Sequence, residues 1–184
     1  LMPESGTHSF LRIIESPHPN SYEPLTTFGW AASELVVNDT DILESRFSGS
    51  EFRVIGKPAD LDMMPDIRAM QVVGNANEVF YLTMFKKKIT VYDLPSAKSD
   101  IDHMFIAVLA SNDVLEVQKW YKDNFDIAIN PINKTKLKLL DDSFGFPEKT
   151  VDYNLAVIPM NGQSFIEVDG YPEEARTRPR LEGY

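Results

Sequence analysis

The chain has 184 residues, 43% of them hydrophobic, and its 18 Lys and Arg against 28 Asp and Glu give a formal net charge of −10. This length and composition predict one globular domain, or two small packed ones, with a hydrophobic core. The negative charge disfavours nucleic acid and anionic membrane surfaces as partners, and the lack of cysteine excludes disulfide scaffolds, thiolate metal sites and cysteine nucleophiles.

The sequence also carries signals about location. No apolar run approaches the roughly 20 residues that a membrane-spanning helix needs. The first residues lack the basic and apolar regions of a signal peptide, so we expect a cytoplasmic protein. Because the sequence begins with Leu1 rather than methionine, we expect it to be part of a longer protein.

The first half of the chain predicts one helix among strands. An opening strand over residues 8–16 is followed by a proline-rich extended connection. A strand over 29–37 precedes Asp39 and Thr40, either of which caps a short helix over 41–47. Three further strands are expected at 51–58, 67–74 and 78–85, with a Gly-Asn-Ala-Asn hairpin turn between the last two. From residue 29 the order is β, α, β, β, β.

The second half repeats this order after a polar linker. A strand is predicted over 103–111, and an amphipathic helix over 113–125 has its apolar residues at helical spacing. The remaining strands are expected at 135–142, 150–160 and 163–171, with an Asn161-Gly162 hairpin turn between the last two.

The two halves align as an internal repeat. The alignment pairs Ala32 with His103 and Thr83 with Glu167. The expected organisation is therefore the last strand of a preceding module plus a connection (1–28), a βαβββ module (29–85), a linker (86–101), a second βαβββ module (102–172) and a tail or linker (173–184).

Three short motifs carry a family resemblance: His103 followed by an apolar strand, the helix ending "KWYKDNFDI", and the closing "SFIEVDGYP". Together with the paired modules, they make the chain similar to the vicinal oxygen chelate superfamily, which includes glyoxalase, bleomycin-resistance proteins, extradiol dioxygenases and epimerases. The resemblance implies an α+β fold in which paired βαβββ modules curve their mixed sheets around a central cup.

The resemblance also implies a divalent metal, held by His or Glu on first strands and Glu on last strands, that acts as a Lewis acid on vicinal oxygens of the substrate. His103 and Glu167 match such ligands. The imidazole and oxygen donors suit Fe, Mn, Zn or Ni. Ala32 and Thr83 occupy the other two places, and alanine cannot bind a metal.

Three sources remain for the missing ligands. Glu34 lies two residues beyond Ala32, on the same face of its strand, and is a candidate metal ligand. His8 is a second source, if the opening strand lines the cup. The third is a further module beyond Tyr184. His103 itself has a structural alternative, as a hydrogen-bonded residue at the start of a strand.

The implied function has two versions. In the first, the protein is a metal-dependent dioxygenase or a glyoxalase-like lyase or isomerase acting on a small oxygenated or aromatic compound. In the second, it binds a small molecule without metal or catalysis, as resistance proteins of this superfamily do. Candidate pocket residues are Phe105, Phe165, Tyr81 and Arg12, although the aromatic ones are equally compatible with core packing. The opening strand predicts pairing with further modules of the same protein or with a second copy in a homodimer.

Overall fold

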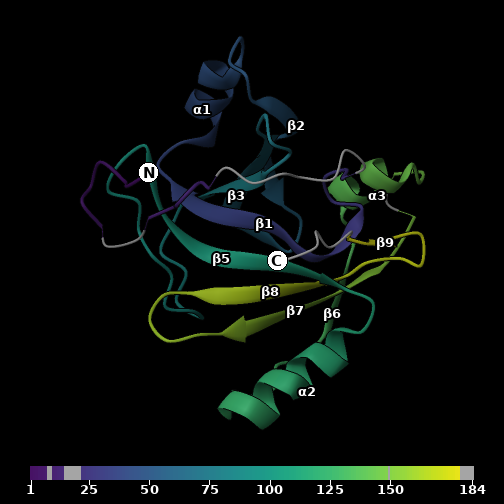
Figure 1. Ribbon diagram of the computed structural model, residues 1–184. Helices are drawn as coiled ribbons and strands as arrows, with labels where there is room; N and C mark the ends of the chain where they lie inside the picture. Colours follow the sequence, from purple (N-terminus) through teal and green to yellow (C-terminus); the bar gives the residue numbers. More distant parts are fainter. Residues whose placement is uncertain (8–9, 15–21, 149, 179–184) are drawn as a thin grey trace. The chain divides into compact units, whose positions relative to one another are not determined.

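The computed structural model describes residues 1–7, 10–14, 22–148 and 150–178 (Figure 1). The chain divides into two compact units. Unit 1 comprises residues 1–15, 33–106 and 162–164, and unit 2 comprises residues 16–32, 107–161 and 165–184. None of the described helices combines the length and apolarity that crossing a membrane requires.

The described residues form strands and three helices in an α+β arrangement. In chain order they are β1 (Thr27–Val37), α1 (Thr40–Phe47), β2 (Arg53–Leu61), β3 (Met64–Val73), β4 (Val79–Phe85), β5 (Ile101–Ser111), α2 (Val114–Phe125), β6 (Asn133–Thr135), α3 (Lys138–Phe144), β7 (Tyr153–Pro159), β8 (Phe165–Gly170) and β9 (Arg176–Thr177).

Unit 1 contains a mixed sheet with the strand order β2-β3-β4-β1. Strand β4 pairs in parallel with β1 and antiparallel with β3, and β3 pairs antiparallel with β2. Helix α1 packs against β2, β3 and β4 (Figure 1). It begins after Asp39, whose side chain accepts the backbone N–H groups of Asp41 and Ile42 at 2.9 and 3.0 Å, so Asp39 is the cap.

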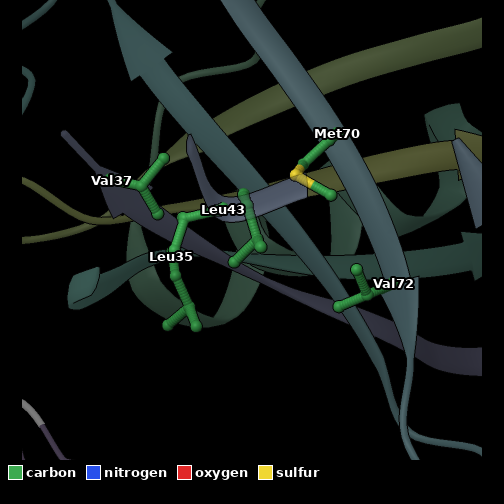
Figure 2. Close-up of a cluster of buried hydrophobic side chains, with 6 residues drawn as sticks. Leu35, Val37, Leu43, Met70 and Val72 are labelled. Atoms are coloured by element: carbon green, nitrogen blue, oxygen red, sulfur yellow. The ribbon is translucent and has the colours of Figure 1, made fainter. Parts of the chain in front are cut away.

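A hydrophobic core fills the space between α1 and this sheet. Figure 2 shows Leu43 of α1 among Leu35 and Val37 of β1 and Met70 and Val72 of β3. Alternate residues of each strand supply these side chains, as expected for one face of a sheet. The neighbouring residues of each strand, including Glu34 immediately before Leu35, therefore point to the opposite face.

Unit 2 holds β8, β7 and β6 in that order, with antiparallel pairing. Its core packs Val114 of α2 against Ala156 and Ile158 of β7 and Ile166 and Val168 of β8. Asp113 caps α2 by accepting the N–H of Glu116 at 2.9 Å. The short strand β9 pairs in parallel with the first residues of β1.

The predicted α+β class is confirmed. The first half has the order β, α, β, β, β from β1 to β4, and the second half has the same order with α3 inserted between β6 and β7. The strand expected at 135–142 is wrong, since only Asn133–Thr135 is a strand and Lys138–Phe144 is a helix. The reason is that Leu139 and Leu140 are adjacent, which breaks the strand-like alternation. Leu140 is 1% exposed, and Asp141 accepts a hydrogen bond from the Tyr153 hydroxyl.

The opening strand expected at 8–16 is not formed where the structure describes it, because residues 10–14 have no regular secondary structure. Residues 8, 9, 15 and 16 lie outside the described residues, and so does the candidate ligand His8. Within the described part, Leu1 and Leu11 exchange backbone hydrogen bonds: the Leu1 amino group donates to the Leu11 carbonyl at 2.7 Å, and the Leu11 N–H donates to the Leu1 carbonyl at 3.0 Å.

Candidate functional site

Glu34 is the buried acid on the face of unit 1 that points away from α1. Its flanking residue Leu35 lies in the α1 core, and so does Leu82, the residue before Thr83. Alternation therefore directs both Glu34 and Thr83 to the opposite face. There the Thr83 hydroxyl donates a hydrogen bond to Glu34 Oε1 at 2.5 Å, and the two residues are 9% and 2% exposed.

Polar side chains extend from Glu34 across the sheet. The strand register places Tyr81 of β4 beside Glu34, and Gln71 of β3 beside Tyr81. Gly56 of β2 is the next position, and a Cβ atom there would lie 1.9 Å from the Gln71 amide oxygen. Glycine thus leaves room for the Gln71 side chain. We call Glu34, Tyr81 and Gln71 the Glu34 row; it brings a carboxyl, a phenol and an amide onto one face.

Burial changes the acidity of Glu34. Loss of hydration disfavours the carboxylate and raises its pKa from 4.5 to about 7, although the Thr83 hydrogen bond lowers it in part. A carboxyl group with this pKa exchanges protons readily at neutral pH, which is the property of a general acid and base.

His103 lies in β5 beside an acidic partner that the sequence analysis did not assign. Its Nδ1 is 3.0 Å from Oδ1 of Asp102, and the Asp102 side chain is fully buried. Burial raises the pKa of Asp102, but hydrogen bonds from the Lys98 backbone N–H, His103, Ser5 and Thr7 outweigh burial and hold that pKa well below its usual range. Asp102 is therefore a buried carboxylate that orients the His103 ring.

In unit 2, Glu167 and a second acidic residue, Asp169, both belong to strand β8. Ile166 and Val168 pack toward α2, so Glu167 and Asp169 point to the other face of β8. Burial raises the pKa of Tyr171 strongly, and the charges of Asp169 and Glu167 raise it further. Arg178 lies 4.6 Å over the Tyr22 ring and donates to the Trp30 carbonyl at 2.7 Å.

Comparison with known proteins rests on structure alone. No protein-family model and no curated protein matches the sequence. Among solved structures, methylmalonyl-CoA epimerase from Mycobacterium tuberculosis aligns with a TM-score of 0.54 at 10% identity, over 85% of this chain and 95% of that one. Glyoxalase I from Zea mays aligns with a TM-score of 0.51 at 11% identity, over 78% of this chain and 43% of that one.

A third structure, methylmalonyl-CoA epimerase in complex with methylmalonyl-CoA and NH4+, aligns with a TM-score of 0.51 at 9% identity, over 82% of this chain and 99% of that one. All three neighbours are vicinal oxygen chelate proteins. The chain has the vicinal oxygen chelate fold. It spans less than half the length of the maize glyoxalase I.

The vicinal oxygen chelate fold implies a metal, and the predicted ligands were His103, Glu167 and Glu34. The described residues contain no group of three or more His, Asp or Glu side chains that could hold a metal ion. Glu34 is bound by the Thr83 hydroxyl, and its raised pKa favours a proton over the ionised form that a metal requires. Glu34 therefore does not offer the ionised donor that a metal needs. The metal ligands His103, Glu167 and Glu34 stay predictions, and we derive no chemical step through a metal.

The predicted pocket residues have different surroundings within the vicinal oxygen chelate fold. Phe105 is 2% exposed, and its ring meets Phe85 edge-on with centroids 5.6 Å apart, as in core packing. Phe165 is buried in β8 of unit 2. Tyr81 belongs to the Glu34 row. Arg12 is exposed, in a segment without regular secondary structure.

Two features of the site were missed from sequence. The first is the position of Gln71 beside Tyr81. The hairpin turn from Gly74 to Asn77 sets the register of β3 and β4, and this register pairs the two residues. Asp102 immediately precedes His103, and a carboxylate beside a histidine is a common way to orient the ring.

Proposed function

We propose that this protein is an isomerase or epimerase of small oxygenated compounds that moves a proton at a carbon next to a carbonyl group. The observation that carries the proposal is the buried, hydrogen-bonded carboxyl group of Glu34, whose pKa of about 7 suits proton transfer at neutral pH. The vicinal oxygen chelate fold, which glyoxalase I and an epimerase also have, is compatible with this chemistry.

The proposed step uses the three members of the Glu34 row. Glu34, as the carboxylate, removes a proton from the carbon, and the electron pair of the broken C–H bond moves to the carbonyl oxygen to form an enolate. The Tyr81 hydroxyl and the Gln71 amide N–H then donate hydrogen bonds to that oxygen. Return of the proton to the same carbon restores the carbonyl group, and it inverts that carbon when the opposite face of the enolate is protonated. In a 2-hydroxy carbonyl compound, protonated Glu34 can instead give the proton to the former carbonyl carbon; the 2-hydroxyl proton then moves to the first oxygen, and a carbonyl group forms at the second carbon, so that atoms and charge balance.

The test is exchange of the substrate proton with solvent. Small 2-hydroxy and 2-oxo carbonyl compounds, and thioesters with a 2-methyl group, are incubated with the protein in D2O, and loss of the proton signal is followed by NMR. We expect exchange with at least one compound class, and a loss of about 10²-fold or more in Glu34→Gln, the range of general acid–base catalysis. Glu51→Gln is the matched control, because Glu51 is exposed and accepts a hydrogen bond from Asn75.

Each assay is run with EDTA and, separately, with Fe2+, Mn2+, Zn2+ or Ni2+, so that a metal requirement is registered. A Glu34→Gln protein that exchanges as fast as the wild type in every arm would contradict the proposal. Oxygen uptake with catechols, measured with EDTA and with each of the four metals, tests for dioxygenase activity.

A second candidate is a binding protein without catalysis. It is favoured by Ala32, which stands where the other module has His103, and by the Thr83 hydrogen bond that already engages Glu34. This candidate predicts saturable binding of a small molecule with no exchange of the substrate proton above the rate in buffer.

A homodimer and a cytoplasmic location stay predictions. Light scattering of the purified protein tests whether it is a homodimer.

A further inference from the structure

A cavity of about 430 Å³ lies in unit 1, on the side of the sheet that faces α1. This volume is in the range of pockets for small organic molecules. Leu43 of α1 and Val72 of β3, which Figure 2 shows in the core cluster, line the cavity together with the N-terminal residues 1–4. We call it the α1 cavity. It is separate from the proposed proton-transfer site, because the Glu34 row points to the opposite face of the sheet.

One part of the α1 cavity is apolar and aromatic. Phe47, Phe52 and Phe80 line it, and the Phe52 ring lies 5.5 Å from the Phe47 ring and 6.4 Å from the Phe80 ring between centroids. All three rings are half-buried, so each keeps surface that a ligand can cover. Covering apolar surface is favourable, and contacts between rings add to this gain. This part of the cavity therefore suits a phenyl or alkyl group.

The Asp102 carboxylate faces the α1 cavity from β5 and lines it. Met104 packs in the α1 core, and Asp102 lies two residues before Met104, on the same face of the strand. Ser5 and Thr7 belong to the N-terminal segment that lines the cavity, and their side chains hydrogen-bond to Asp102. The alternation along β5 and these contacts both place the carboxylate on the cavity side of the sheet.

This carboxylate has hydrogen-bond donors but no lysine or arginine beside it. Its donors are the Lys98 backbone N–H, His103, and the hydroxyl groups of Ser99, Ser5 and Thr7. Within the part of the chain that the structure describes, the ion-pair contact of Asp102 is with the His103 ring and not with a lysine or arginine. A buried carboxylate without such a cation leaves a negative potential in the adjacent cavity.

A second acid lies at the same end of the α1 cavity. Glu4 lines the cavity and is exposed, and it directly precedes Ser5, which contacts Asp102. Arg46 is the one lysine or arginine among the described lining residues, and it is already paired with Asp100 at 2.5 Å. The amino group of Leu1 donates to the Leu11 carbonyl and pairs with neither acid. This end of the cavity therefore attracts cations and repels anions.

We propose that the α1 cavity binds an organic ammonium ion, with its aromatic or alkyl body against Phe47, Phe52 and Phe80 and its ammonium group at the end formed by Glu4 and Asp102. Charge complementarity selects this class of ligand, because both acids repel a carboxylate or phosphate group. The ammonium group donates a hydrogen bond to Glu4. Asp102, whose oxygens already accept several hydrogen bonds, acts through its charge.

The test uses three ligands that share a phenylpropyl group and differ in the head group: 3-phenylpropylamine, 3-phenylpropan-1-ol and 4-phenylbutanoate. Titration calorimetry at neutral pH should show saturable binding of the amine, binding of the alcohol weaker by about tenfold, and no saturable binding of the anion. Glu4→Gln should weaken binding of the amine by about threefold, the range of an exposed ion pair, and leave the alcohol unchanged. The matched Glu51→Gln change, at an exposed residue outside the cavity, should alter neither.

Methyl NMR during titration with the amine locates the bound molecule. The methyl signals of Leu43, Val72 and Leu82, which line the α1 cavity, should shift with the affinity that calorimetry gives. The methyl signals of Ile166 and Val168, in the core of unit 2, should stay in place.

Four results would overturn the proposal. The amine fails to saturate the wild-type protein, it binds no better than the alcohol, or its binding leaves the methyl signals of the α1 cavity unshifted. These three need no variant, so they stand even if Glu4→Gln does not fold. The fourth is a folded Glu4→Gln protein that keeps the full preference of the wild type for the amine over the alcohol.

Discussion

The hydroxyl of Thr83 donates a 2.5 Å hydrogen bond to the carboxyl group of Glu34, and both residues are almost fully buried in unit 1. Thr83 stands where the second module has Glu167, and Glu34 is two residues from Ala32, which stands in the place of His103. Thr83 thus places a hydroxyl group that donates to Glu34 at a position where a metal ligand was expected. This substitution underlies our proposal of proton transfer by Glu34.

The raised pKa of Glu34 predicts a pH-dependent stability. The folded state holds the Glu34 proton up to a pKa of about 7, whereas the unfolded chain releases it near 4.5. The favourable contribution is complete below pH 4.5 and is lost as the pH rises through 7, by up to about 3 kcal/mol. Glu34→Gln should remove this loss, so urea unfolding should show the variant gaining stability relative to the wild type between these pH values.

Glu51→Gln is the control for this comparison, because Glu51 is exposed. If the difference in unfolding free energy between the wild type and Glu34→Gln is constant from pH 4.5 to 7, the Glu34 carboxyl does not hold a proton as proposed.

Asp102 should stabilise unit 1 and retain the N-terminal segment. Asp102→Asn removes a buried carboxylate that accepts from Lys98, His103, Ser5 and Thr7. We expect a loss of about 1–3 kcal/mol in unfolding free energy at pH 7 and faster amide hydrogen exchange in residues 1–7. Because the folded pKa lies below 3.8, the wild-type advantage should be present above that pH and should disappear as the pH falls through the folded value.

The matched variant is Asp100→Asn, whose carboxylate is 58% exposed and pairs with Arg46 at the surface. We expect less than about 1 kcal/mol for it. Equal effects of the two variants would show that the Asp102 contacts contribute no more than a surface ion pair.

Tyr153 tests the core of unit 2. Its hydroxyl donates to Asp141 Oδ1 at 2.7 Å, and both side chains are buried. Tyr153→Phe should cost about 1–3 kcal/mol in unfolding free energy, because a buried carboxyl oxygen loses a donor. Tyr92→Phe, at a residue 43% exposed, should change the unfolding free energy much less. No difference between the two variants in urea unfolding would argue against a stabilising Tyr153–Asp141 bond.

Periodicity and turn residues were sufficient to predict most of the fold. Asp39 marked the start of helix α1, and the hairpin turns marked the ends of the strands that they join. These signals could be read from the sequence because each involves only a few neighbouring residues. The segment 135–142, which contains the start of the helix Lys138–Phe144, was mistaken for a strand because residues 136–139 alternate between polar and apolar. The contact that accompanies the helix, from Tyr153 to Asp141, comes from a residue outside this segment. The two-residue strand β9 has no periodicity to detect, since it exists only by pairing with β1.

The candidate site was predictable only in part, for the same reason. Glu34 was predicted as a candidate ligand on the same strand face as Ala32, but its pKa depends on burial and on Thr83, 49 residues away in sequence. His103 was assigned to its strand correctly, whereas the Asp102 contact depends on the orientation of the side chain. Its role as a metal ligand stays a prediction.

The most direct measurement compares two pH dependences, that of solvent exchange of the substrate proton and that of the 13C NMR signal of the Glu34 carboxyl carbon. We expect the exchange rate to rise with pH, with a midpoint equal to the Glu34 pKa of about 7. Thr83→Val should move both midpoints upward together, because it removes the hydrogen bond that lowers this pKa. An exchange midpoint that stays in place while the Glu34 pKa rises would contradict the assignment of Glu34 as the base.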